Sequence, residues 1–354
     1  MAVLLGVALA ALAAEGLLRT TGAGSPPAVK VAIVDVARDE LRFHCYPSNP
    51  DGAFDPLPES VPPDWLVVEL RDPPVPAGRD ALASRPWCVG YTYGRRGVRG
   101  PAVPDLPMPW TQRIVGVGDS FAFGEGVRHA DTLFARLDRD LGDRIEVVNC
   151  ARSGADLALD VATLEWAAAT LHPARALLVL TPNDIGAPSS GGHGRGGSHD
   201  LINVRDTTPG PVAWSRLAGL VHRAATAPAR AAATERAYLA AHDPHANPEG
   251  LARAAHLLRR VAAIDGVRTA VVVFPLMHRL DDDHPLAPAH ERLAQLAADA
   301  GLPVLDLLPA FRGHDAATLH VHPTDHHPHA RAHGIAADAV ARWLRDDVPG
   351  FLER

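Results

Sequence analysis

The chain is poor in cysteine and in lysine. Three cysteines in 354 residues are too few for a protein held together mainly by disulfides. Lysine is nearly absent, while alanine, arginine and proline are abundant, which indicates a base bias of the coding genome. The net charge of −7 gives no reason to expect a nucleic acid or an acidic lipid surface as a partner. No internal repeat is visible, and no apolar run reaches the roughly 20 residues that cross a membrane as a helix.

The remaining composition is that of a globular protein. Hydrophobic residues make up 47% of the chain and charged residues 21%, and both values are ordinary for folded domains. A chain of this length can bury a sizeable core and suits one large domain with an accessory segment. We predict a leader over residues 1–24, an irregular β-rich segment over 25–110, and a main domain over 111–347 with an insertion at about 187–245.

The N-terminus is apolar but has no basic residue before the apolar stretch. Residues 2–14 are uncharged, and Glu15 and Arg19 follow them. The stretch is short for a membrane span, and the positive start of a signal peptide is missing. A packed helix, an uncleaved anchor over residues 2–18 and a cleaved signal all stay open. We expect export or anchoring, with the main domain outside the cytoplasm; a packed helix would leave it cytoplasmic.

Two of the cysteines, Cys45 and Cys88, lie in loop-like sequence, whereas Cys150 ends an apolar run. None of the three has the spacing typical of a metal site. In an exported protein Cys45 and Cys88 can form a disulfide, and in a cytosolic protein both stay reduced.

From residue 112 onward, short apolar runs alternate with segments of helical periodicity. This alternation predicts an α/β protein, a three-layer α/β/α sandwich around a five-stranded parallel sheet. The expected strands are 114–117, 145–149, 176–180, 268–274 and 303–307. The expected helices are 132–141, 157–170, 251–264, 288–300 and 329–344.

Polar residues and glycines follow these strands, at the edge where open α/β sheets bind ligands. Gly118-Asp119-Ser120 ends the first strand, Gly154 follows the second and Asn183 follows the third. Asp325 and His327 stand together just before the last helix. A serine hydroxyl becomes a good nucleophile when a base accepts its proton, and an imidazole oriented by a carboxylate is such a base.

The order of serine, glycine, asparagine and histidine in these blocks resembles that of the SGNH hydrolases, also called GDSL esterases and lipases. The resemblance covers about residues 113–344. The segment 93–100 and the apolar leader are similar to parts of bacterial relatives. The resemblance implies a flavodoxin-like sheet and an ester hydrolase.

Carried over by motif position, the resemblance implies a role for five residues. Ser120 is the nucleophile, His327 the general base, and Asp325 the carboxylate that orients the histidine. The backbone N–H groups of Ser120 and Gly154 and the side-chain amide of Asn183 form the oxyanion site. Preorganised donors of this kind stabilise the developing negative charge in acyl transfer.

Three positions depart from the usual family pattern. Thr181 stands where glycine is usual, and His329 stands where asparagine usually follows His-Pro. Asp325 lies two residues before the histidine instead of three, a spacing that some bacterial relatives share. We expect Asp119 and Asp184 to tie loops together rather than to react.

Other chemistries fit the sequence less well. His329 and His333 have the i, i+4 spacing of helical metal ligands, but no acidic or cysteine partner completes a site. Phe121 replaces the third glycine of a dinucleotide-binding turn, and the serine motif lacks the final glycine of a nucleophile elbow. We therefore expect no metal and no organic cofactor.

The expected reaction is hydrolysis of an O-acyl ester, of a small molecule or a glycan, through an acyl-serine intermediate. Transfer of the acyl group to a glycan or another envelope alcohol uses the same residues and stays open. A non-catalytic binding protein of the same fold is the remaining alternative, and the presence of every reacting group argues against it.

Overall fold

The computed structural model describes residues 2–21, 30–50, 52–58, 61–69, 75–76, 87–185, 212, 214–245, 247–323 and 325–353. The first part of the expected insertion, residues 187–211, lies outside these residues. The chain divides into two units: residues 1–28 with 203–238, and residues 29–202 with 239–354. The second unit holds the sheets and the candidate site.

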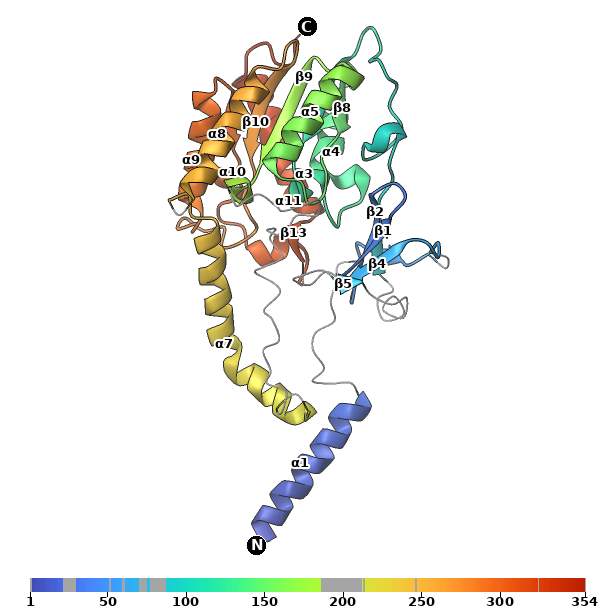
Figure 1. The fold of residues 1–354 in the computed structure, drawn as a ribbon, viewed down its shortest axis with the longest axis vertical. Coiled ribbons are helices and arrows are strands. Elements are labelled where there is room, and N and C mark those ends of the chain that lie inside the picture. The colour runs from blue at the N-terminus through green and yellow to red at the C-terminus, as the bar shows by residue number, and fades with distance from the viewer. Residues whose placement is uncertain are drawn as a thin grey trace. The chain divides into compact units, whose positions relative to one another are not determined.

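The centre of the second unit is a five-stranded parallel sheet, which confirms the expected fold class (Figure 1). Its strands are β7 (Gln112–Val117), β8 (Ile145–Asn149), β9 (Arg175–Leu180), β10 (Arg268–Val273) and β11 (Val304–Asp306). They pair in the order β11-β10-β9-β7-β8, which is the flavodoxin-like order 2-1-3-4-5. Every residue of β7 is buried, as expected for a strand covered on both faces.

Five helices cover this sheet. They are α4 (Leu133–Asp140), α5 (Leu157–Leu171), α8 (Pro248–Ala262), α9 (Ala287–Asp299) and α11 (Ala330–Asp346). Helix α8 packs against α5 and α9, and α4 packs against α11, so that the two groups lie on opposite faces (Figure 1). Helix α11 begins at Ala330 because the His329 side chain accepts hydrogen bonds from the backbone N–H groups of Arg331 and Ala332.

Shorter elements lie on the connections around the sheet. They are η1 (Arg95–Gly97), α3 (Ser120–Phe123), η2 (His129–Asp131), η3 (Pro182–Ile185), α10 (Leu308–Phe311), η5 (Ala316–Leu319) and the paired strands β12 (His320–His322) and β13 (Asp325–Pro328). Two of them, α3 and β13, contact each other. That contact joins the end of β7 to a segment about 200 residues later in the chain.

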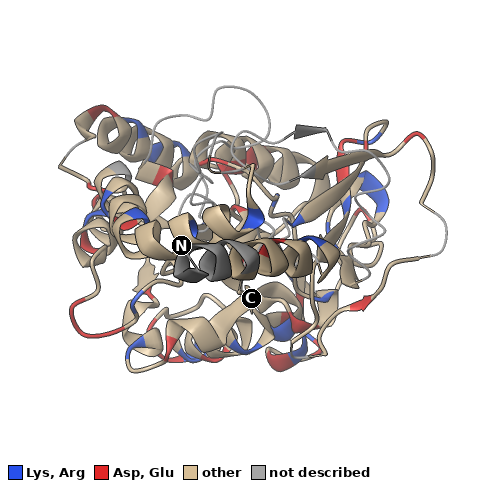
Figure 2. Cartoon of the chain, turned by 90° about the horizontal axis from the view of Figure 1, so that it is seen from below, with Lys and Arg blue, Asp and Glu red and all other residues tan. Residues whose placement is uncertain are grey.

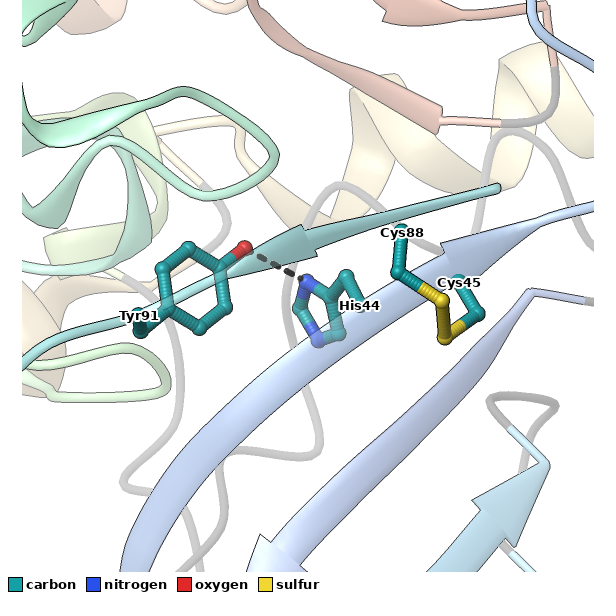
Figure 3. The surroundings of a disulfide bond; sticks show 4 residues. All are labelled: His44, Cys45, Cys88 and Tyr91. Atoms are coloured by element: carbon teal, nitrogen blue, oxygen red, sulfur yellow. Dashed lines mark hydrogen bonds between the residues drawn. A yellow bond between two sulfur atoms is a disulfide. The ribbon is translucent and has the colours of Figure 1, made fainter. Parts of the chain in front are cut away.

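The N-terminal part of the second unit forms an antiparallel sheet. Its strands are β1 (Val31–Asp35), β2 (Glu40–Tyr46), β3 (Asp55–Pro56), β4 (Leu66–Glu69), β5 (Val75–Pro76) and β6 (Trp87–Gly90), in the order β3-β6-β2-β1-β4-β5. Cys45 of β2 lies opposite Cys88 of β6, and the two form a disulfide (Figure 3). Val31, Ile33 and Val67 complete its small buried core.

The first unit consists of α1 (Ala2–Thr21) and nearly all of α7 (Arg216–Ala241). Glu15 of α1 caps the start of α7, since its carboxylate accepts bonds of 2.9 Å from the backbone N–H groups of Arg216 and Leu217. These bonds lower the pKa of Glu15 to about 2. Among the helices described, none combines the length and the apolar character needed to cross a membrane. Figure 2 shows basic and acidic residues interspersed over the described elements.

Candidate active site

Ser120, His327 and Asp325 meet at the carboxyl edge of the parallel sheet. Ser120 is the first residue of α3, and the other two lie two positions apart on β13. Oγ of Ser120 lies 2.9 Å from Nε2 of His327, and Nδ1 of His327 lies 2.5 Å from Oδ1 of Asp325. Both separations are within hydrogen-bond reach, so one imidazole connects the hydroxyl to the carboxylate.

The turn that presents Ser120 depends on a glycine and on an aspartate. Gly118 has a φ of +149°, and a Cβ atom there would lie 2.7 Å from both the Ala122 side chain and the Val179 carbonyl oxygen. The Asp119 carboxylate then accepts a 2.9 Å bond from the Phe121 N–H, which caps α3. The chain therefore turns sharply after β7 and leaves the Ser120 hydroxyl facing His327.

Asn183 lies on η3, directly after β9, and the same aspartate holds it. Its Nδ2 group donates a 3.1 Å bond to Oδ2 of Asp119, and the Thr181 hydroxyl donates to that oxygen over the same distance. Asp119 is fully buried, and burial raises the pKa of its carboxyl. An amide carries two N–H groups, so Asn183 can donate to Asp119 and also to an oxyanion. Thr181, one of the three departures from the usual pattern, thus belongs to this anchor.

Gly154 lies in the turn between β8 and α5 and has a φ of +76°, a conformation that glycine adopts without strain. The turn is tied to β7, because the backbone N–H of Arg152 donates to the Gly118 carbonyl over 3.0 Å. Ser120, Gly154 and Asn183 thus follow the three neighbouring strands β7, β8 and β9. The structure brings all five expected site residues to one edge of the sheet.

Behind the histidine lies a buried polar network that no motif in the sequence marks. The Lys30 ammonium donates to Oδ2 of Asp325 over 2.6 Å and to Oε1 of Glu125 over 2.8 Å. The Tyr46 hydroxyl donates to the same Asp325 oxygen over 2.8 Å. Oε1 of Glu125 also lies 3.7 Å from Nδ1 of His327. The one signal in the sequence is the position of Glu125 between two glycines, in the loop after Ser120.

Two further members of the network come from the antiparallel sheet. Nδ1 of His44 lies 3.3 Å from Oε1 of Glu125, and the Tyr91 hydroxyl is within 3.1 Å of the same nitrogen. Figure 3 shows this pair beside the disulfide, with His44 on β2 and Tyr91 directly after β6. Tyr91 in turn accepts a 2.7 Å bond from the Gly126 N–H. The antiparallel sheet therefore packs polar side chains directly against the loop after Ser120.

The carboxylates decide the electrostatics of the site. Burial by itself would lower the pKa of His327, but the Glu125 and Asp325 carboxylates outweigh burial and raise it. Burial also opposes the charge of Lys30, and the same two carboxylates raise its pKa. Burial lowers the pKa of His44 to about 3, so that this imidazole is neutral. The site thus favours protonation of His327 while its other neighbour, His44, stays uncharged.

Glu125, Asp325 and His327 have ligand atoms close enough together to surround a metal ion. The Lys30 ammonium, however, already binds both carboxylates, and Nε2 of His327 receives the Ser120 hydroxyl. The Lys30 ammonium therefore offsets the negative charge of the two carboxylates, which a bound metal ion would otherwise offset.

The spaced histidines of α11 have other partners. His329 caps the helix, and Nδ1 of buried His333 accepts a 3.1 Å bond from the Leu133 N–H. Each imidazole therefore uses a ring nitrogen to bind the backbone.

Comparisons with solved structures give several proteins of related fold. A member of the lipolytic protein G-D-S-L family from Veillonella parvula DSM 2008 is 14% identical, with a TM-score of 0.34, over 68% of this chain and 100% of that one. The chain is similar to GDSL proteins. TesA is 17% identical, with a TM-score of 0.42, over 66% of this chain and 98% of its own. A carbohydrate acetylesterase family member from Sinorhizobium meliloti is 15% identical, with a TM-score of 0.36, over 66% of this chain and 98% of that one. No family model and no curated protein sequence matches the chain.

Proposed function

We propose that this GDSL-like chain is a serine hydrolase of the SGNH type that cleaves O-acyl carboxylic esters. The observation that carries the proposal is the continuous path from the Ser120 hydroxyl through His327 to Asp325, with separations of 2.9 and 2.5 Å. A path of this kind activates a hydroxyl that is otherwise a poor nucleophile.

In the proposed reaction, Ser120 Oγ attacks the ester carbonyl while Nε2 of His327 accepts the hydroxyl proton. The bond between the carbonyl carbon and the leaving oxygen then breaks, and His327 returns the proton to the departing alcohol. Water then attacks the acyl-serine carbonyl while His327 accepts a proton from it. The bond to Ser120 Oγ breaks, His327 returns the proton to Oγ, and the acid is released. Asp325 keeps the proton on Nδ1, so that Nε2 faces Ser120 as the acceptor. The raised pKa of His327 fits an imidazole that carries a proton in each intermediate.

The oxyanion would be stabilised by hydrogen-bond donors that are already in place before the reaction begins. The backbone N–H groups of Ser120 and Gly154 and the second Nδ2 hydrogen of Asn183 are our candidates. The bond from Asn183 to Asp119 supports this assignment, because it fixes the amide without using both of its hydrogens.

The test is hydrolysis of p-nitrophenyl acetate and butyrate by the full chain, beside the Ser120→Ala variant. We expect the variant to lose about 10³-fold or more in kcat, with the circular dichroism spectrum unchanged. Ser215→Ala is the matched control, since Ser215 belongs to the first unit, and it should keep full activity. Equal rates for the chain and for Ser120→Ala would overturn the proposal. Faster ester consumption after adding a sugar alcohol, with acylated sugar as product, would indicate a transferase instead.

A further inference from the structure

Lys30 joins the antiparallel sheet to the candidate triad. It is the residue before β1, and its side chain is 3% exposed, as is that of Glu125, while Asp325 is 0% exposed. Its ammonium lies between the two carboxylates, at 2.6 Å from Asp325 and 2.8 Å from Glu125. Since Asp325 is 295 positions away in the chain, the contact is wholly a product of tertiary folding.

The choice of lysine at this position is unusual for this chain. Lys30 is the one lysine among 34 lysine and arginine residues. A lysine presents a compact point charge on a flexible stem, whereas arginine presents a wide planar fork. An ammonium bound to two carboxylates, within a space that admits almost no water, suits the compact cation. The guanidinium of arginine, which is the residue at every other Lys or Arg position of this chain, would need more room.

The groups that face His327 come from every element packed around it. They are Asp325 and His326 of β13, Glu125 and Asp119 next to α3, Lys30 and His44 from the antiparallel sheet, and His333 of α11. Burial lowers the pKa of His44, His326 and His333 to about 3, so these three are neutral near pH 7.

The charges that act most strongly on the imidazole are those of Glu125, Asp325 and Lys30. Two carboxylates and one ammonium carry a net charge of one negative unit when all three are ionised. Protonation of His327 brings this group to neutrality. An imidazolium is thus better accommodated here than beside a single, fully neutralised carboxylate.

We propose that Lys30 and Glu125 are positioning residues of the site: Lys30 fixes the Asp325 carboxylate, and Glu125 offers His327 a second carboxylate that stabilises its imidazolium. The inference rests on the proposed function for its catalytic meaning. It implies that the N-terminal sheet completes the active site, because Lys30 and Tyr46 both bind the carboxylate that orients the histidine.

The two residues should shift the titration of His327 in opposite directions. Glu125→Gln removes a negative charge 3.7 Å from Nδ1, and should lower the pKa of His327 by about one unit. Adding Lys30→Met to that variant removes the opposing positive charge and should raise the pKa again. The double variant also keeps the buried group in charge balance, and it is therefore more apt to fold than Lys30→Met alone.

The experiment follows His327 in the full chain by NMR with ¹⁵N-labelled histidine, alongside the pH profile of kcat/KM. The His327 signal is identified by its loss in His327→Gln. His290, which lies 2.7 Å from Asp306 elsewhere in the fold, is the internal control. Its NMR signal should be the same in the wild type and in every variant. Glu165→Gln, at an exposed ion pair with Arg260, is the matched control for the loss of a carboxylate. We also expect the double variant to lose about tenfold or more in kcat, because Asp325 is held less firmly.

The outcomes separate this inference from the proposed function. Opposite shifts of the His327 signal and of the acidic limb of the profile support the inference. Opposite NMR shifts in a chain inert toward every ester support the charge relationship and overturn the proposed function. An active enzyme whose His327 titration is the same in the wild type, in Glu125→Gln and in the double variant overturns the inference.

Discussion

The Tyr46 hydroxyl donates a 2.8 Å hydrogen bond to Oδ2 of Asp325, a residue 279 positions later in the chain. Tyr46 directly follows Cys45, which is bonded to Cys88 on the neighbouring strand. The disulfide therefore fixes the strand that delivers Tyr46 to the carboxylate. Removal of the disulfide should affect both stability and activity.

For Cys45→Ala/Cys88→Ala we expect a loss of about 4 kcal/mol in the free energy of unfolding, because the bond closes a long loop in the unfolded chain. The bridged residues are 43 positions apart. The kcat for ester hydrolysis should also fall, since Tyr46 loses its fixed position. Urea unfolding and p-nitrophenyl acetate hydrolysis measure the two effects.

Cys150→Ala is the control for this prediction, since it removes the buried free thiol and leaves the disulfide intact. A double variant as stable as that control would contradict the prediction.

We also propose that the disulfide forms in the cell, with the second unit outside the cytoplasm. Alkylation of the denatured protein from its native host should then modify Cys150 alone, and modification of all three cysteines would exclude this.

Asn183→Ala should lower kcat by about 10²–10³-fold, because one donor to the oxyanion is lost. KM should change little, since the donor acts on charge that develops in the transition state. Steady-state kinetics on p-nitrophenyl butyrate measure both constants. Thr181→Val tests the anchor: it removes one of the two side-chain donors to Oδ2 of Asp119 and keeps the Asn183 amide. An Asn183→Ala variant with wild-type kcat would remove Asn183 from the oxyanion site.

Acid should destabilise the fold from about pH 6.5 downward, because several buried histidines are neutral in the folded chain. Burial lowers the pKa of His44, His326 and His333 to about 3 and that of His284 to about 4. In the unfolded chain these histidines gain protons near pH 6.5, whereas the folded chain does not bind them until much lower pH. Stability is therefore lost as the pH falls below about 6.5, by about 1 kcal/mol per pH unit for each histidine. His327, whose pKa is raised, acts in the opposite direction.

Thermal melts between pH 8 and pH 5 measure this dependence as a fall in Tm. His333→Gln should flatten the curve by the share of one histidine, because glutamine can accept the Leu133 N–H and does not titrate. A Tm that is constant across this range would contradict the assignment of neutral buried histidines.

The parallel sheet was predictable because its signals are local. Each strand is a short apolar run bounded by polar or glycine residues, and helices such as α4, α8 and α11 have an apolar periodicity of their own. The strands expected at 114–117 and 145–149 lie within β7 and coincide with β8. The sequence expected for a helix at 329–344 forms α11, one residue later at its start because His329 serves as the cap.

The amino-acid sequence alone determined where the candidate site residues stand relative to the strands and helices of this protein. A serine, a glycine and an asparagine follow successive strands, and Asp325 and His327 stand before the last helix. For the serine, the glycine and the asparagine this placement is enough, because parallel strands bring their carboxyl ends to one edge. The contacts of Lys30, Glu125 and Tyr46 were decided by tertiary structure. Their partners are far apart in the chain, and a charge that is buried only by folding leaves no local pattern in the sequence.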